Sequence, residues 1–244
     1  METVLIKEQY KVIRVLYTAE HFAAVLATDI TSSLNEQCVL NIYDGNLLKP
    51  YLTYFSDLKH CPEFVELFVR DESVVAVFRY ARGKNIDSIF YRGNKRTNSE
   101  NIEAADLLIE KAISVADYPP NVGCPLLLSE NTGYEETNRT FVFTHVIFPF
   151  PPMNPREQVL LLSDQLKKII RIRYDTSLAA RTFIRDFQQK IYESVPELSS
   201  EWHTVREGLI KEASVTESSS LAARIINIIK INVVDFFRRL TGIK

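Results

Sequence analysis

The character of the residues changes near Gly83, and this change constrains the fold of the 244-residue chain more than any other feature. Before Gly83, branched and aromatic residues form runs between turn-like stretches, which is typical of β-strands. After it, apolar residues recur at intervals close to 3.6, which predicts helices. We therefore expect an α+β protein with a β-rich lobe over residues 1–83 and a mainly helical lobe, which also holds a β-hairpin, over residues 84–213.

Five strands and one inserted helix are predicted for the β-rich lobe. Its last two strands meet at Asp71 and Glu72, which favour a tight turn. The result is an antiparallel meander that carries its helix between the third and fourth strands. The strands are predicted at residues 10–17, 22–30, 38–43, 64–70 and 73–80, and the helix at residues 47–58.

The helical lobe is predicted to contain four helices and the hairpin. Ser99 is the expected N-cap of the helix at residues 99–117, and Pro119 and Pro120 end that helix. Two apolar segments joined by a polar loop indicate the hairpin. The predicted helices span residues 85–91, 99–117, 155–174 and 177–195, and the hairpin joins strands at residues 125–128 and 140–148 through the loop 129–139.

Residues 214–244 are predicted to form a third part, a serine-rich hinge at residues 214–220 followed by an amphipathic helix at residues 221–240. Ser220 can cap this helix. Projected at 100° per residue, one face is apolar and the opposite face is largely basic. The apolar face holds Ala222, Ile225, Ile226, Ile229, Val233, Phe236, Phe237 and Leu240, and the polar face holds Arg224, Asn227, Lys230, Asp235, Arg238 and Arg239.

Three interpretations of this terminal helix remain open. Its charges exclude a helix that crosses a bilayer. The apolar stripe fits ordinary core packing against the helical lobe. An interfacial helix on a membrane surface, or a helix that binds a partner protein, fits the same pattern.

The charge, the cysteine content and the first residues of the chain limit the classes of protein to which it can belong. The formal net charge of −2 provides no general attraction to nucleic acid. The three cysteines, Cys38, Cys61 and Cys124, are too few and too scattered for a disulfide framework or a pair of metal-binding knuckles, which suits a reducing compartment. The first residues lack the basic start and apolar core of a secretory signal, so we expect a cytoplasmic protein.

Several segments between about residues 8 and 150 resemble protein kinases. Residues 38–43 resemble the third kinase strand, and residues 60–68 resemble the stretch after the kinase C helix. Residues 74–83 look like the fifth strand and the hinge, and residues 85–90 like the helix after it. Residues 126–133 are similar to the strand and turn after the catalytic loop. The order of elements is also that of a kinase domain, so the resemblance implies a two-lobed kinase-like fold with a reduced helical lobe.

The residues that bind phosphate in kinases are replaced in this chain. A kinase needs a glycine-rich turn close to the phosphates. The corresponding turn, residues 18–22, has no glycine and carries Glu20, whose charge would repel phosphate. Asn41 stands at the position of the phosphate-binding lysine. The predicted helix has no glutamate to pair with a lysine, and its nearest acid, Asp57, is expected to be a surface carboxylate.

The positions for proton transfer and magnesium are also changed. The catalytic aspartate and the metal-binding asparagine align near Pro120 and Pro125, and proline has no side-chain base or metal ligand. The metal-binding aspartate before the activation segment aligns near Thr144 or His145, which leaves no carboxylate for magnesium. The resemblance therefore implies a pseudokinase.

No other pattern indicates catalysis. His21, His60, His145 and His203 lie far apart in the sequence, without the spacing of a metal site. No nucleophile-elbow or oxyanion-loop pattern accompanies a serine or cysteine. We therefore expect a protein that is not an enzyme and has no catalytic residue, no cofactor and no metal ligand.

The function expected from these features is that of a scaffold or regulator that binds an unidentified protein. The alternatives are a peripheral membrane component held by the terminal helix and a divergent nucleotide-binding transferase. A bacterial type VII secretion component with a cytoplasmic pseudokinase domain beside a membrane span is similar in architecture, which is an analogy of role only. The candidate interaction residues are Phe78, Arg79, Tyr80, Arg82, Ile225, Ile229, Val233, Phe236, Phe237, Arg238 and Arg239.

Overall fold

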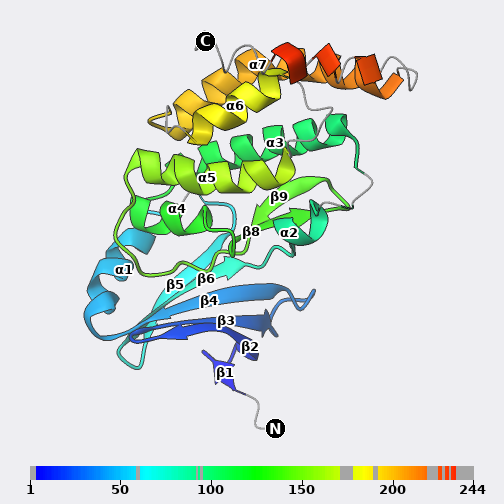
Figure 1. Cartoon of the computed structure of the whole chain (residues 1–244). Helices are drawn as coiled ribbons and strands as arrows, with labels where there is room; N and C mark the ends of the chain where they lie inside the picture. The colour runs from blue at the N-terminus through cyan, green and yellow to red at the C-terminus, as the bar shows by residue number, and fades with distance from the viewer. Residues whose placement is uncertain are drawn as a thin grey trace. The chain divides into compact units, whose positions relative to one another are not determined.

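The protein is α+β and divides into two compact units (Figure 1). The computed structural model describes residues 4–58, 61–91, 93, 96–170, 178–188, 192–218, 225–226, 229–230 and 232–234. Unit 1 comprises Met1–Asn85 and Ser114–Met153, and unit 2 comprises Ile86–Ile113 and Asn154–Lys244. These units are discontinuous in sequence, whereas the predicted lobes, 1–83, 84–213 and 214–244, are consecutive.

Unit 1 contains a six-stranded antiparallel sheet in the order β1-β2-β3-β4-β6-β5. The five predicted strands are confirmed, and the short strand β1 was not predicted. The order differs from a simple meander because the connection through a helix after β4 places β5 at the sheet edge, beyond β6. The strands are β1 (Leu5–Ile6), β2 (Tyr10–Ala19), β3 (Phe22–Asp29), β4 (Gln37–Tyr43), β5 (Phe64–Arg70) and β6 (Ser73–Arg79).

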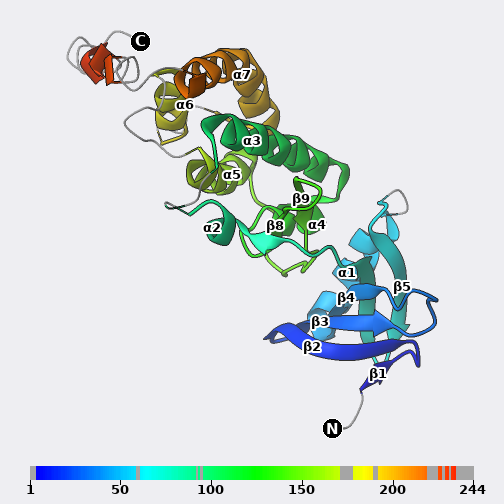
Figure 2. The ribbon, with the colours of Figure 1, turned by 90° about the vertical axis from the view of Figure 1, so that its right-hand side faces the viewer.

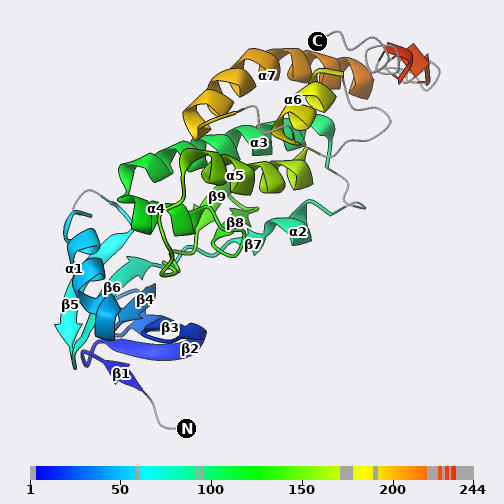
Figure 3. The same ribbon diagram turned by 60° about the vertical axis from the view of Figure 1, so that its left-hand side comes forward.

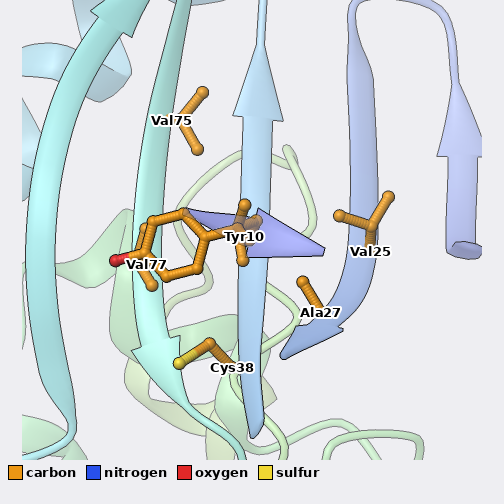
Figure 4. Packing of buried hydrophobic residues seen from close by; sticks show 7 residues of the cluster. Tyr10, Val25, Ala27, Cys38, Val75 and Val77 are labelled. Atoms are coloured by element: carbon orange, nitrogen blue, oxygen red, sulfur yellow. The ribbon is translucent and has the colours of Figure 1, made fainter. Parts of the chain in front are cut away.

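The sheet curls, so that the start of β2 approaches β5. Tyr10 donates a hydrogen bond from its hydroxyl to Oε1 of Glu66 at 2.7 Å, and its ring stacks on Phe68 with centroids 6.4 Å apart. Because side chains alternate across a strand, one face of the curled sheet collects a single apolar cluster. The cluster is Tyr10, Val25, Ala27, Cys38, Leu40, Val75 and Val77 (Figure 4).

Helix α1 (Leu48–Ser56) packs beside β5 and β6, as Figure 3 shows. A single 3-10 turn, η1 (Gly45–Leu47), leads into it. The ring of Tyr51 stacks on Tyr43 of β4 at a centroid distance of 4.0 Å, and Phe55 meets Phe78 of β6 edge to face. Aromatic packing therefore fixes the helix that was predicted at residues 47–58.

A second, three-stranded sheet in unit 1 has the order β7-β8-β9. The predicted strand at residues 125–128 is wrong. Pro125 and Leu126 are the last residues of helix α4, and residues 127–128 lie in the turn after it. Pro120 is in the first turn of this helix, where its missing N–H costs nothing. The true partner of β9 lies in the predicted loop. The elements are β7 (Lys84–Asn85), η2 (Ser114–Asp117), α4 (Pro120–Leu126), β8 (Thr132–Glu135) and β9 (Thr140–Phe143).

Unit 2 is helical in the residues that the structure describes, and its helices α3, α5, α6 and α7 pack against one another (Figure 2). The predicted N-cap Ser99 is wrong, because Thr97 caps α3. The hydroxyl of Thr97 accepts from the amide of Glu100, whose carboxylate accepts from the amide of Thr97 in return. The helices are α2 (Ile86–Ile89), α3 (Asn98–Ile113), α5 (Pro155–Ile169), α6 (Leu178–Gln188) and α7 (Val195–Ser218).

Helix α7 was not predicted, and its last residues, 214–218, are helical where the sequence predicted a hinge, while residues 219–220 lie outside the described residues. Leu198, Trp202, Leu209 and Ala213 are buried at helical spacing, and this buried stripe carries the helix past Ser214. The described residues between 225 and 234 are also helical, as predicted for the terminal helix. Among the described residues, no helix is both long and apolar enough to span a membrane.

Candidate functional site

The segment after β9 is hydrogen-bonded to the centre of β4 by a fully buried asparagine. Asn41 donates from Nδ2 to the carbonyl of His145 at 2.9 Å, and the amide of Ile147 donates to its Oδ1 at 2.8 Å. The Tyr43 hydroxyl donates to the carbonyl of Ile147 at 2.6 Å. Three buried bonds therefore hold residues 145–147 against one face of the main sheet.

A second buried asparagine bonds the middle residue of the same segment. Asn131, directly before β8, donates from Nδ2 to the carbonyls of Val146 at 2.7 Å and Pro125 at 2.8 Å. The amide of Val146 donates back to its Oδ1 at 2.9 Å. Because a buried backbone group without a partner is costly, Asn41 and Asn131 together make this irregular segment stable inside the protein.

His145 lies between these two asparagine contacts and points into the core of unit 1. Its backbone is in the left-handed region, with φ of 62°, where a residue other than glycine is strained. The ring is buried and stacks on Phe78 with centroids 5.0 Å apart and planes 10° apart. Phe143 meets the ring edge to face. The histidine is therefore a packed core residue.

Phe148 extends this segment to the hairpin of β2 and β3. Its ring meets Tyr17 of β2 edge to face at 4.8 Å, and Phe22 of β3 at 6.1 Å. Phe22 also stacks on Tyr43 at 5.0 Å. Because Asn41 and Tyr43 share one face of β4, the segment from His145 to Phe148 covers a continuous surface of the sheet up to the hairpin turn.

The hairpin turn itself is held by the loop that precedes α1. His21, at φ of 60°, approaches Oδ1 of Asp44 with its Nδ1 at 2.6 Å, and its carbonyl accepts from the amide of Asp44. Gly45 has φ of 52°, and a Cβ there would lie 2.7 Å from the His21 ring. Only glycine suits this position, so the turn is fixed by sterics as well as by hydrogen bonding.

The positions that the sequence resemblance aligns with kinase functional residues divide between the core and the surface. Asn41, Pro125 and His145 are buried, and the Asn41 side chain and the carbonyls of Pro125 and His145 form hydrogen bonds within the protein. Helix α1 contains no acidic residue. Asp57 is exposed just beyond it, which confirms the predicted surface carboxylate.

The cysteines are not set up as nucleophiles. Burial raises the pKa of the Cys38 thiol to about 11 and also raises the pKa of Cys61, which donates from its sulfur to the Tyr118 hydroxyl at 3.2 Å. A thiol with a raised pKa stays protonated at neutral pH and is a poor nucleophile. All three cysteines are described, and none forms a disulfide.

The described residues also hold no group of three histidine, cysteine, aspartate or glutamate side chains placed to bind a metal. His21 and His145 stand in the separate environments given above, and His203 is exposed on α7. His60 lies outside the described residues.

The predicted interaction residues are only partly at the surface. Phe78 is fully buried, so it serves the core and is not available for direct contact with a partner. Arg79 is exposed and donates to the carbonyl of Pro62, Arg82 is exposed and Tyr80 is half-buried. Ile225, Ile229 and Val233 are exposed, whereas Phe236, Phe237, Arg238 and Arg239 lie outside the described residues.

Unit 2 contains a polar contact that the sequence did not reveal. Asp106 of α3, almost fully buried, accepts from Nε1 of Trp202 at 2.9 Å through one oxygen. Its other oxygen lies 2.8 Å from Nη2 of Arg206. Both partners are on α7, so this contact joins the two helices and has the geometry of a structural ion pair.

Comparison with known proteins gives no family for the chain. No protein-family model matches it, and no curated protein matches it significantly.

Proposed function

We propose that the chain is a degenerate protein-kinase fold that transfers no phosphate and acts by binding another protein. The fold assignment is supported by the order of elements: β2, β3 and β4, then α1, β5 and β6, then α3 and the β8–β9 pair. That order is the one the sequence resemblance implies. In this proposal, a protein with this fold acts as a scaffold or regulator.

The place of Asn131 supports the same assignment and changes one detail of it. The kinase catalytic loop carries its metal-binding asparagine five residues after the catalytic aspartate and just before a strand pair. Asn131 is directly before β8, so it takes the asparagine position, and Leu126 takes that of the aspartate. This replaces the alignment to Pro120 and Pro125. Leu126 is fully buried and has no group that accepts a proton.

The observation that carries the proposal is the use of Asn41. At the position of the phosphate-binding lysine, its amide is occupied by the backbone of His145 and Ile147. Asn131 is engaged in the same way, with both side-chain atoms bonded to the chain. Neither side chain can bind phosphate or magnesium without breaking buried hydrogen bonds, each of which costs about 1–3 kcal/mol.

Phe148 adds a steric argument. In kinases the first hairpin turn covers the nucleotide phosphates. Here the ring of Phe148 contacts Tyr17 and Phe22 on both strands beside that turn. The surface that would face a nucleotide is therefore filled by the chain's own aromatic side chains.

Thermal unfolding with and without Mg-ATP tests this proposal. A ligand that binds the folded state at about 100 times its Kd stabilises it by about 2.7 kcal/mol, which raises Tm by several degrees in a protein of this size. We expect a change below about 1 °C at 5 mM Mg-ATP. A rise of several degrees would favour the divergent transferase instead.

A second experiment tests the protein-binding part. The exposed residues Arg79 and Arg82 flank the end of β6, and we propose that they contribute to the partner surface. Proteins that bind the full chain should no longer bind the variant R79E/R82E. They should still bind the control K11E/R14E, which makes the same charge change on the exposed face of β2. Equal retention by both variants would place the partner surface elsewhere.

A further inference from the structure

The terminal helix presents an apolar face that the rest of unit 2 leaves exposed. The exposed fractions of Ile225, Ile226 and Ile229 are 50%, 67% and 58%, and Val233 is 47% exposed. At 100° per residue these four side chains fall within an arc of about 100°, so they form one continuous stripe. The alternative that this stripe is ordinary core is wrong for these residues.

The helix has a defined side that faces the protein. Nη1 of Arg181 on α6 donates to Oδ1 of Asn232 at 3.0 Å, and Asn232 is half-buried. Asn232 lies at the edge of the apolar stripe on the helical projection. The described contact with α6 is therefore a polar one, and Ile225, Ile226 and Ile229 stay at least half exposed beside it.

Charge distinguishes this segment from the rest of the chain. Residues 221–244 contain five basic residues and one acidic residue, whereas residues 1–220 contain 24 basic and 30 acidic residues. The segment is thus strongly positive on an otherwise negative protein. Lys230, next to the apolar stripe, is exposed. An apolar face beside positive charge is the pattern of a helix that lies in the interface of an anionic bilayer.

We propose that residues 221–240 bind the surface of an anionic membrane, with the stripe from Ile225 to Val233 in the headgroup region and the basic residues near lipid phosphates. A neutral membrane lacks the electrostatic attraction that basic residues supply. A second copy of the chain would bring two positive segments together, which disfavours self-association through this face. The membrane proposal does not depend on whether the protein binds a nucleotide. Failure of one of the two proposals therefore does not affect the other.

Vesicle co-sedimentation of the full chain tests the proposal. The probe is a vesicle of phosphatidylcholine with 30% phosphatidylglycerol, compared with phosphatidylcholine alone. We expect binding at least tenfold stronger to the anionic vesicles, and a clear loss at 1 M salt, where the Debye length falls to about 3 Å. Equal binding to both vesicles, or binding to neither, would overturn the proposal.

Variants locate the binding face. I225Q/I226Q/I229Q should weaken anionic-vesicle binding at least tenfold, because glutamine keeps the helix but not the apolar stripe. The matched control I13T/V15T/V69T removes three equally exposed apolar residues from strands of unit 1 and should bind as the unchanged protein does. Trp202 fluorescence checks that the variants stay folded. Full binding by the glutamine variant would overturn the proposal. So would a concentration-dependent dimer of the unchanged protein, if the glutamine variant lost only this dimer and still bound vesicles.

Discussion

The amide of Ile147 donates a buried hydrogen bond of 2.8 Å to Oδ1 of Asn41, which joins the centre of β4 to a residue 106 positions later in the chain. The same side chain returns a bond to the carbonyl of His145. One amide group thus satisfies two backbone groups of an irregular buried segment, and it does so at the position that the sequence resemblance aligns with the phosphate-binding lysine of kinases.

Replacing Asn41 should therefore destabilise unit 1. The variant N41L has a similar volume but leaves the carbonyl of His145 and the amide of Ile147 without these partners. At about 1–3 kcal/mol for each buried group, we expect the free energy of unfolding to fall by about 2–5 kcal/mol in a denaturant titration. The control D57N changes an exposed residue and should stay within about 0.5 kcal/mol. A neutral N41L would show that the segment is not held by Asn41.

The contact of Asp106 with Trp202 and Arg206 should stabilise the packing of α3 on α7. D106N keeps an oxygen for the indole N–H but loses the charge that attracts Arg206, so we expect a loss of about 1 kcal/mol. D106L removes both contacts and should cost about 2–4 kcal/mol. Denaturation followed by the fluorescence of Trp202, the single tryptophan, measures both values. The exposed E103Q on the same helix is the control, and equal effects of D106N and D106L would contradict this division.

Two glycines should respond in opposite directions to alanine. A Cβ on Gly133 would lie 2.7 Å from the Cα of Gly83 and 3.0 Å from its carbonyl carbon, so G133A forces β8 away from the chain before β7. We expect a loss of about 1–3 kcal/mol. Gly208 is exposed inside α7 with no atom within 4 Å of an added Cβ, and G208A should stabilise by up to about 1 kcal/mol. Thermal unfolding of both variants measures this contrast. A G133A variant as stable as the unchanged protein would show that the backbones of Gly83 and Gly133 are not in close contact.

Alkaline pH should destabilise the protein in part through Cys38. Burial raises the pKa of this thiol to about 11, above the value of about 8.5 for an exposed cysteine. Between these values the unfolded chain has released the proton while the folded protein retains it, so stability falls as pH rises from about 8.5 to 11. The variant C38A should lose less stability than the unchanged protein over this interval. Parallel pH curves for the two proteins would contradict the raised pKa.

Sequence patterns identified the elements whose signal is local. The runs of branched and aromatic residues in β2 to β6 and the apolar spacing of α3 and α5 are visible in the residues themselves. A short apolar run such as residues 125–128 fits a strand or a helix, so its pattern was ambiguous. In the structure, Pro120 suits the first turn of a helix and a turn satisfies its last carbonyls, and these two helix ends favour α4 over a strand. The serine-rich segment suggested a hinge, but the buried stripe that includes Trp202 outweighed the weak helix propensity of Ser214 and Ser218, which belong to α7.

The candidate site depended on contacts that no local pattern encodes. The asparagine at position 41, which the kinase resemblance aligns with a lysine, was visible in the sequence, and so was the lack of a glutamate in α1. That Asn41 and Asn131 would bond to the same backbone segment was not, because their partners lie up to 106 residues away. Phe78 was predicted to lie on an interaction surface with Arg79, but β6 is buried on both faces from Val74 to Phe78, so the phenylalanine belongs to the core.

Isothermal titration of the full chain with Mg-ATP at 25 °C tests most directly whether the nucleotide site is closed. With the amides of Asn41 and Asn131 bonded to the chain and Phe148 packed beside the hairpin turn, we predict no saturable heat up to millimolar ATP. Saturable binding with a Kd below about 0.1 mM, equivalent to more than about 5 kcal/mol of binding free energy, would contradict the proposal that this is a silent, protein-binding module.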